Sequence, residues 1–227
     1  MDNITSTEHT DNTTTETEMK RGLFILFEGV DRVGKSTQVQ ALTNYMSTTL
    51  SLPTKQLRYP DRTTQTGVII NSYLQSATQL DDRALHLLFS ANRWESRDNI
   101  LTELKNGTNL IVDRYAYSGV AYSAAKGIDY DWCFNCEKGL PAPDVIFYLH
   151  MDSEETTKRG DYGNERYEKL DFQKKIKDIY EKRLLQSSNN WKQIDANRPI
   201  ADISLEISSI IDDTLRQGVN SKPLQCI

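Results

Sequence analysis

The chain has 227 residues, with 27 lysines and arginines against 32 aspartates and glutamates. This length suits one sizeable hydrophobic core. The mildly acidic balance argues against a nucleic-acid duplex as the main partner, because proteins that bind duplexes favour a basic face. No apolar run approaches the ~18 residues of a membrane span, so we expect no membrane partner. Three cysteines make no disulfide framework; we interpret Cys133-x-x-Cys136 as structural thiols in a reducing compartment, and a redox role stays open.

Residues 1–19 are rich in threonine and acidic side chains and contain no lysine or arginine. Such a segment buries too little apolar surface to offset its chain entropy, so we expect an acidic, disordered extension. It lacks the apolar core of a secretion signal and the arginines of a mitochondrial transit peptide, which favours the cytoplasm or nucleus. The folded domain is expected over residues 20–217, with a tail at 218–227.

A phosphate-loop pattern, Gly29-x-x-x-x-Gly34-Lys35-Ser36, follows the apolar run Leu23–Phe27 and precedes Thr37–Met46, which has no glycine or proline. Strand, glycine loop and helix in that order are the context in which the pattern binds phosphates. Glycines let successive N–H groups point into one concavity, and the helix that follows adds its positive end. Lys35 suits the outer phosphates and the Ser36 hydroxyl suits magnesium. The alternative is a chance match in a helix-capping turn.

Four further strands are expected, at Thr54–Tyr59, Asn109–Val112, Val145–Leu149 and Trp191–Ile194. They alternate with helical stretches, which include Asp81–Lys105, Phe172–Leu185 and Ile200–Leu215. This alternation predicts an α/β fold with a doubly wound, five-stranded parallel sheet and helices on both faces. The helix from Asp81 is expected to bury one apolar stripe in the core, made of Ala84, Leu87, Leu88, Ala91, Trp94, Leu101 and Leu104.

Charged residues follow two of the strands, at the edge of a parallel sheet where ligands collect. Arg62, after the second strand, is a candidate anion binder or a solvated loop arginine. Asp113 ends the third strand and is a candidate to orient magnesium or its water. Arg114 beside it can clamp a phosphate with two hydrogen bonds. A buried structural Asp–Arg pair is the competing interpretation.

Two other features point to a nucleotide without proving one. Phe89 and Arg93 lie one helical turn apart, off the apolar stripe, where a ring could stack on a base and a guanidinium could bind its edge. Spacing alone favours a surface cation–π pair or a second buried face. Residues 155–168 are charged and contain glycines, so they form either a lid over the phosphates or an ordinary exposed loop.

Taken together, four segments resemble the thymidylate kinase family of the eukaryotic and poxviral type: residues 29–37, 87–95, 113–122 and 163–168. The resemblance runs from about Arg21 to Leu215. It implies a P-loop nucleoside monophosphate kinase fold, a three-layer sandwich with a short lid. It also implies transfer of the γ-phosphoryl of ATP to dTMP, giving dTDP and ADP for dTTP synthesis. Magnesium as cofactor, ATP and dTMP as ligands and a homodimer follow from the same resemblance.

The resemblance also assigns residues, position by position. Catalytic roles fall to Asp31, Arg32, Lys35 and Arg114. The ATP-binding set is Arg32, Val33, Gly34, Lys35, Ser36, Thr37, Arg159, Asn197 and Arg198, with the last three near adenine. The dTMP-binding set is Asp31, Tyr59, Arg62, Phe89, Arg93, Arg114, Ser118, Gly119, Tyr122 and Tyr167. Ser36 and Asp113 are the metal-site residues.

Within the dTMP set, the resemblance implies that Phe89 stacks on thymine and Arg93 reads its carbonyl edge. Tyr122 crowds the 2′ position of the sugar, and Arg32 bridges the donor and acceptor phosphates. Tyr59 and Asp61 stand where the family more often has Phe and Glu, which affects fine geometry only.

Three alternative functions are compatible with a phosphate loop. A GTPase would need a guanine-reading Asn-Lys-x-Asp motif, which the sequence lacks. A non-catalytic scaffold is disfavoured because Lys35, Asp31 and Arg114 are all retained. A kinase with a broader acceptor range, including dUMP or dGMP, stays open, because acceptance depends on side-chain placement around the thymine methyl group.

Overall fold

The computed structural model describes residues 20–152 and 166–227, and within them five parallel strands form one sheet. The strand order is β2-β3-β1-β4-β5. The strands are β1 (Phe24–Glu28), β2 (Thr54–Arg58), β3 (Asn109–Asp113), β4 (Val145–His150) and β5 (Trp191–Asp195). All five lie where the sequence predicted them. Phe27 of β1 pairs with Asp113 of β3 and with Phe147 of β4, so the residues that follow these strands share one edge of the sheet.

Burial follows the position of each strand in the sheet. Every residue of β1 and β3 is buried, because helices cover both faces of these strands, as near-continuous apolar runs require. The edge strand β2 carries Thr, Lys, Gln and Arg and is largely exposed on its polar positions.

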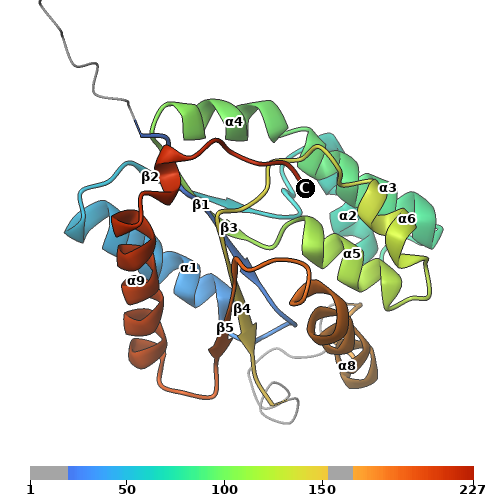
Figure 1. Cartoon of the computed structure of the whole chain (residues 1–227). Coiled ribbons are helices and arrows are strands. Elements are labelled where there is room, and N and C mark those ends of the chain that lie inside the picture. Colours follow the sequence, from blue (N-terminus) through green and yellow to red (C-terminus); the bar gives the residue numbers. More distant parts are fainter. Residues whose placement is uncertain (1–19, 153–165) are drawn as a thin grey trace, which may run out of the picture.

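Helices cover both faces of the sheet, as a doubly wound fold requires. Helices α1 (Lys35–Asn44) and α9 (Ile200–Arg216) pack together on one side, and α5 (Ala116–Ala124) and α8 (Leu170–Ile179) lie on the other (Figure 1). The crossover through α4 (Arg97–Lys105) runs in the same direction as those through α5 and α8, so right-handed connections place it on their face.

The remaining elements extend this frame. Helices α2 (Gln65–Leu74), α3 (Asp82–Trp94) and α6 (Tyr130–Asn135) pack outward from α5, which contacts both α3 and α6. Short π-helical turns, η1 (Tyr45–Thr49) and η2 (Tyr180–Leu184), continue α1 and α8, and a 3-10 turn, η3 (Val219–Ser221), follows α9. The predicted α/β three-layer sandwich is confirmed.

The prediction of one helix over residues 81–105 is wrong. Helix α3 ends at Trp94 and α4 begins at Arg97. At the break, the Ser96 hydroxyl donates to the Arg93 carbonyl (2.9 Å), a local bond that competes with helix continuation. Serine is a weaker helix breaker than glycine or proline, so the break has no clear signal in the sequence.

The expected apolar stripe of this segment is also wrong in part. Leu87 is 49% exposed and Trp94 is 38% exposed. The face of α3 turned inward instead carries polar side chains, among them His86, Ser90 and Asn92. Distant segments satisfy them: Ser90 Oγ donates to the Cys136 carbonyl, and Asn92 Nδ2 donates to the Asp61 carbonyl. Partners far apart in sequence cannot be read from helical periodicity.

Three other outcomes concern the segments between and beyond the strands. Helices α2, α5 and α6 were not predicted. Residues 218–227, assigned to a tail, run back over the domain, where Cys226 forms an antiparallel bridge with Pro141. The extension at 1–19 and lid residues 155–165 lie outside the described residues. No helix in the described ranges is both long and apolar enough to cross a membrane.

Candidate active site

The phosphate loop connects β1 to α1 and requires an unusual backbone. Gly29 has φ +140°, and a Cβ there would lie 2.3 Å from the Leu149 carbonyl oxygen. Gly34 has φ +95°, and Arg32 between them adopts φ 64°. The glycines therefore allow the chain to curl against β4, and the loop borders a cavity. That cavity is lined by Asp31, Arg32, Gly34, Lys35, Ser36, Thr37, Arg58, Asp113, Arg114 and Glu168.

Lys35 lies across the loop, where its Nζ donates to the Val30 carbonyl (2.6 Å). Burial and the nearby charge of Arg114 lower the pKa of Lys35 to about 7, against the opposing effect of Asp113, Asp31 and Glu28. The ammonium form is therefore only marginally stable in the free protein. An anion bound beside Lys35 would favour that charged form.

The residues proposed for magnesium fit a hard cation. Ser36 Oγ donates to Asp113 Oδ2 (2.5 Å), so a hydroxyl and a carboxylate meet at the floor of the cavity. Magnesium prefers oxygen ligands and usually keeps several waters and substrate phosphates beside one or two protein groups. Among residues 20–152 and 166–227, no group of three or more His, Cys, Asp or Glu could hold a metal. Ser36 and Asp113 together offer the one or two oxygen donors that suit a magnesium ion shared with nucleotide phosphates.

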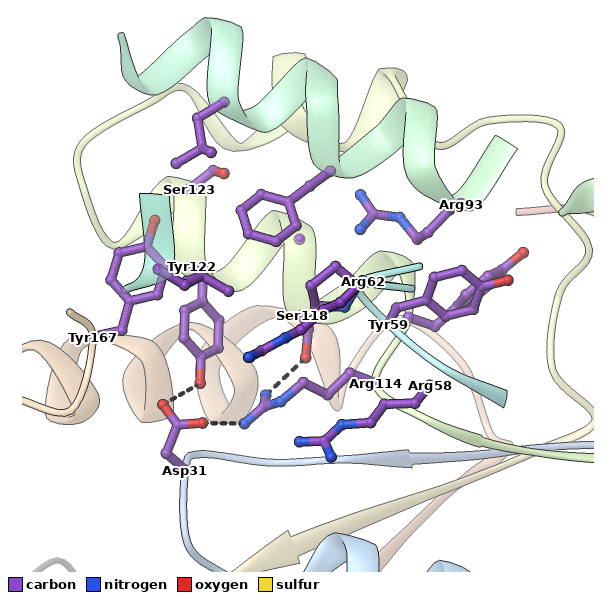
Figure 2. A pocket seen from close by; sticks show the side chains of 16 residues that line it. Asp31, Arg58, Tyr59, Arg62, Arg93, Arg114, Ser118, Tyr122, Ser123 and Tyr167 are labelled. Atoms are coloured by element: carbon purple, nitrogen blue, oxygen red, sulfur yellow. Dashed lines mark hydrogen bonds and ion pairs between the residues drawn. The ribbon is translucent and has the colours of Figure 1, made fainter. Parts of the chain in front are cut away.

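A second cavity lies beside the first, and three residues line both (Figure 2). All ten residues expected to bind dTMP line it: Asp31, Tyr59, Arg62, Phe89, Arg93, Arg114, Ser118, Gly119, Tyr122 and Tyr167. The structure brings them together from α3, from α5, from the segments that follow β1, β2 and β3, and from the segment before α8.

One end of this cavity is mainly apolar and aromatic. Phe89 and Arg93 reach it from α3, and Figure 2 shows the Arg93 guanidinium directed toward its centre. Tyr122 and Tyr167 form the side wall, with ring centroids 5.5 Å apart. An aromatic slot with one cation suits a flat, polar heterocycle.

The two cavities share a wall made by Asp31, Arg58 and Arg114. Arg114 Nη2 donates to Asp31 Oδ1, and its Nη1 donates to the Gly29 carbonyl (3.0 Å) and to Ser118 Oγ (3.1 Å). Tyr122 donates its hydroxyl proton to Asp31 Oδ2 (2.9 Å; Figure 2). Arginine side chains therefore lie where ligands bound in the two cavities would come into contact.

The charge of Asp31 is stabilised in this wall. Burial alone would raise its pKa, but the positive charges of Arg114 and Lys35 and the hydrogen bonds from Tyr122 and Gln173 hold the pKa below its usual range. Gln173 of α8 makes two hydrogen bonds to Asp31. Its Nε2 donates to Asp31 Oδ2 (2.7 Å), and its Oε1 accepts from the Asp31 amide (2.9 Å).

Glu28 supports the wall from behind, although no sequence pattern used above singles it out. It is fully buried at the end of β1. Its Oε1 accepts from the amides of Tyr115 and Ser118, at the start of α5, and its Oε2 accepts from the hydroxyls of Ser118 and Tyr180. An acid that closes an apolar strand directly before the phosphate-loop glycine was the available signal.

Two further lining residues were also missed. Arg58, at the end of β2, lies 3.9 Å from Asp113 Oδ2 and lines both cavities. Glu168 accepts from Arg32 Nε at 2.7 Å, which ties the phosphate loop to the segment before α8. Arg58 closes a strand at the ligand-binding edge, a signal equal to that used for Arg62.

The residues expected near adenine are placed less completely. Arg159 lies outside the described residues. Asn197 and Arg198 follow β5 at the same edge of the sheet, but they line neither cavity. Asn197 bonds Asp195, and Arg198 pairs with Glu206 of α9.

Comparisons with known proteins point to one family. A family model described as thymidylate kinase matches residues 27–207. A thymidylate kinase from Dictyostelium discoideum is 70% identical over 202 residues, which cover 89% of this chain and 90% of that protein. The human thymidylate kinase is 39% identical over 206 residues, covering 90% and 96%. The solved thymidylate kinase of Candida albicans, a protein described as having broad substrate specificity, superposes with a TM-score of 0.82 at 37% identity and covers 91% of this chain and 98% of its own.

Proposed function

This chain belongs to the thymidylate kinase family, and we propose that its two adjoining cavities hold the two nucleotides of that family's reaction. The enzyme transfers the γ-phosphoryl of ATP to dTMP and gives dTDP and ADP for dTTP synthesis. The observation that carries our assignment of the two sites is their shared wall of Asp31, Arg58 and Arg114. Two nucleotides facing each other across that wall would bring their phosphates together.

We assign ATP to the phosphate-loop cavity. Its phosphates would be bound by Arg32, by the amides of Val33 to Thr37 and by Lys35. Lys35 lines this cavity, and its Nζ is held by the Val30 carbonyl of the loop. Ser36 and Asp113 would hold magnesium, which supplies charge neutralisation on the phosphates. Arg159, Asn197 and Arg198 are proposed to contact adenine, and position at the end of β5 supports this for the last two.

We assign dTMP to the aromatic cavity. Thymine would stack on Phe89 and present a carbonyl to Arg93, and Tyr122 would crowd the 2′ position so that a ribose fits poorly. Arg62 and Arg114 would bind the phosphate, with Ser118 fixing Arg114. Tyr59, Gly119 and Tyr167 complete the lining.

Charge explains the chemistry of the step. The acceptor phosphate is itself the nucleophile and is ionised near neutral pH, so the protein needs no general base. The obstacle is the approach of two anions, and positioning with electrostatic stabilisation dominates phosphoryl transfer. Lys35, Arg32 and Arg114 supply positive charge from both sides of the wall, and Asp31 fixes Arg114 and orients the acceptor.

A coupled ADP-release assay across nucleoside monophosphates tests the proposal. We expect dTMP to be the preferred acceptor with ATP and magnesium, and Lys35→Met to abolish turnover. Efficient use of dUMP or dGMP would support the broader acceptor range, which we do not favour. An enzyme that releases no ADP with dTMP would contradict the proposal.

We also propose a homodimer formed through the outer helices. Leu87 and Trp94 on α3 and Val68 and Ile69 on α2 are exposed apolar side chains on neighbouring helices. Apolar side chains gathered on one surface commonly mark an interface. Light scattering should give twice the chain mass, and Leu87→Glu should give the mass of one chain. A wild-type monomer at micromolar concentration would contradict this proposal.

We place the enzyme in the cytoplasm or nucleus. All three cysteines are free thiols, and Cys133 is buried, which suits a reducing compartment. Fractionation of cells that produce the protein would test this placement, and recovery from an oxidising compartment would contradict it.

A further inference from the structure

We propose that Glu137 is the positioning residue that sets recognition of the base by Arg93, without itself touching the nucleotide. The inference rests on the proposed function, in which Arg93 reads the thymine carbonyl edge. It concerns a loop residue 44 positions away from Arg93 in sequence, after α6, that the sequence analysis did not consider.

The two side chains form a bidentate ion pair away from solvent. Arg93 Nε donates to Glu137 Oε2 at 2.8 Å, and Arg93 Nη2 donates to Glu137 Oε1. The side chain of Glu137 is fully buried, and that of Arg93 is 2% exposed. Nη1 has no acceptor among residues 20–152 and 166–227, and Arg93 lines the cavity. The pair thus holds one edge of the guanidinium and leaves its other donors for a ligand.

Gly119 of α5 closes the other side of the guanidinium. A Cβ at position 119 would lie 2.5 Å from Arg93 Nη2 and 3.1 Å from Nη1. Arginine in water samples many rotamers, and ordering it on binding costs affinity. Confinement between Glu137 and Gly119 removes that cost before the nucleotide arrives, so the donors are already aimed at the base.

His86 is not a second cation beside the Glu137 carboxylate. Its Nε2 lies 4.0 Å from Glu137 Oε1 and 3.1 Å from the Cys133 carbonyl oxygen, and its Nδ1 lies 2.8 Å from Ser123 Oγ. Burial lowers the pKa of His86, which keeps the ring neutral. Arg93 is therefore the cation that balances Glu137.

The loop that carries Glu137 is fastened on two sides. The preceding Cys136 carbonyl accepts from Ser90 Oγ and Trp94 Nε1 of α3, both at 3.0 Å. The following residues pair with the end of the chain, since Gly139 N donates to the Ile227 carbonyl (3.1 Å) and Ile227 N donates to the Leu140 carbonyl (2.9 Å). The position of the carboxylate is thus fixed relative to α3, which carries Phe89 as well.

Glu137→Gln is the first test, because it keeps the shape of the side chain but turns an amide N–H group toward an N–H group of Arg93. We expect KM for dTMP to rise about 10- to 100-fold, the size of a disarranged charge-assisted hydrogen bond. KM for ATP and kcat should stay within about threefold, since the phosphates lie at the other end of the site. Glu103→Gln, in an exposed pair with Lys55, is the matched control and should change nothing.

A double-mutant cycle separates positioning from general damage to the fold. In the Arg93→Met background, Glu137→Gln should add no further rise in KM for dTMP, because the residue through which it acts is gone. Glu137→Asp keeps the carboxylate and should give a smaller rise than Glu137→Gln. If Glu137→Gln does not fold, Glu137→Asp must still show a rise confined to dTMP.

Two results would overturn the inference: an unchanged KM for dTMP in the folded Glu137 variants, or effects of Arg93→Met and Glu137→Gln that simply add. A wild-type enzyme that fails to phosphorylate dTMP would instead refute the proposed function, so the two failures are distinguishable.

Discussion

Arg114 and Asp31 form an ion pair in the wall that separates the two cavities. Asp31 follows β1 and Arg114 follows β3, and these neighbouring strands end in register. Arg114 adopts φ 67° directly after β3, and its guanidinium bonds Asp31, Ser118 and the Gly29 carbonyl. The sheet thus places a cation at the proposed meeting point of the two nucleotides, and the carboxylate holds it by an ion pair.

Removing the charge of Asp31 should impair turnover more than ATP binding. Asp31→Asn would place an amide donor among Arg114, Tyr122 and Gln173, which all donate to the carboxylate. We expect kcat to fall about 100-fold, as for other misplaced reacting groups, with KM for ATP changed less than about threefold. Asp98→Asn, at an exposed carboxylate, is the control for steady-state kinetics. An unchanged kcat would exclude Asp31 from the mechanism.

Arg32 is expected to act on the transferring phosphoryl. Arg32→Ala should lower kcat by roughly 10³- to 10⁵-fold, as for arginines that serve this role in related enzymes, while ATP affinity falls far less. The variant also loses the contact with Glu168, so thermal unfolding must be measured beside activity. Arg216→Ala, at the exposed end of α9, provides the matched arginine control. Equal turnover in wild type and Arg32→Ala would remove Arg32 from the mechanism.

The lowered pKa of Lys35 predicts that the protein takes up protons when ATP binds. Its pKa of about 7 in the free protein makes it mostly neutral at pH 8, and bound phosphates stabilise the charged form and raise the pKa. Uptake should therefore increase from pH 6, where Lys35 is already protonated, to pH 8. Calorimetry in two buffers of different ionisation enthalpy measures it, and Lys35→Met corrects for protons released by ATP itself. Identical uptake by wild type and Lys35→Met at pH 8 would contradict this prediction.

Glu28 should matter chiefly for stability. Glu28→Gln retains one acceptor oxygen but turns an amide donor toward either two backbone N–H groups or two hydroxyls. We expect a loss of about 1–3 kcal/mol in the free energy of unfolding, measured by urea titration. Glu103→Gln should lie within about 0.5 kcal/mol of wild type, as surface substitutions usually do. A Glu28→Gln variant as stable as wild type would show that the buried hydrogen bonds are readily replaced.

The sequence predicted the fold well because its signals are local. Each strand is a short run bounded by turn residues, and Gly29 to Ser36 marks the phosphate loop without reference to any distant residue. Position at the end of a strand also marked Asp113 and Arg114 as candidate site residues. These patterns depend on period and order along the chain, which the sequence displays directly.

The supporting residues could not be predicted in the same way. Glu28 bonds Ser118 at a separation of 90 residues, and Glu137 holds Arg93 across 44. The inward face of α3 is polar because Cys136 and Asp61 supply partners, so hydrophobic periodicity selected the wrong stripe. Residues that contact a ligand stand at recognisable positions, whereas those that hold them depend on tertiary packing.

The most direct test of the account is a crystal structure with dTMP and a non-hydrolysable ATP analogue bound together. We expect thymine against Phe89 with a carbonyl oxygen within hydrogen-bond distance of Arg93, and the two nucleotides' phosphates meeting beside Arg114 and Asp31. Thymine density in the phosphate-loop cavity, or phosphates that approach from outside the shared wall, would contradict it.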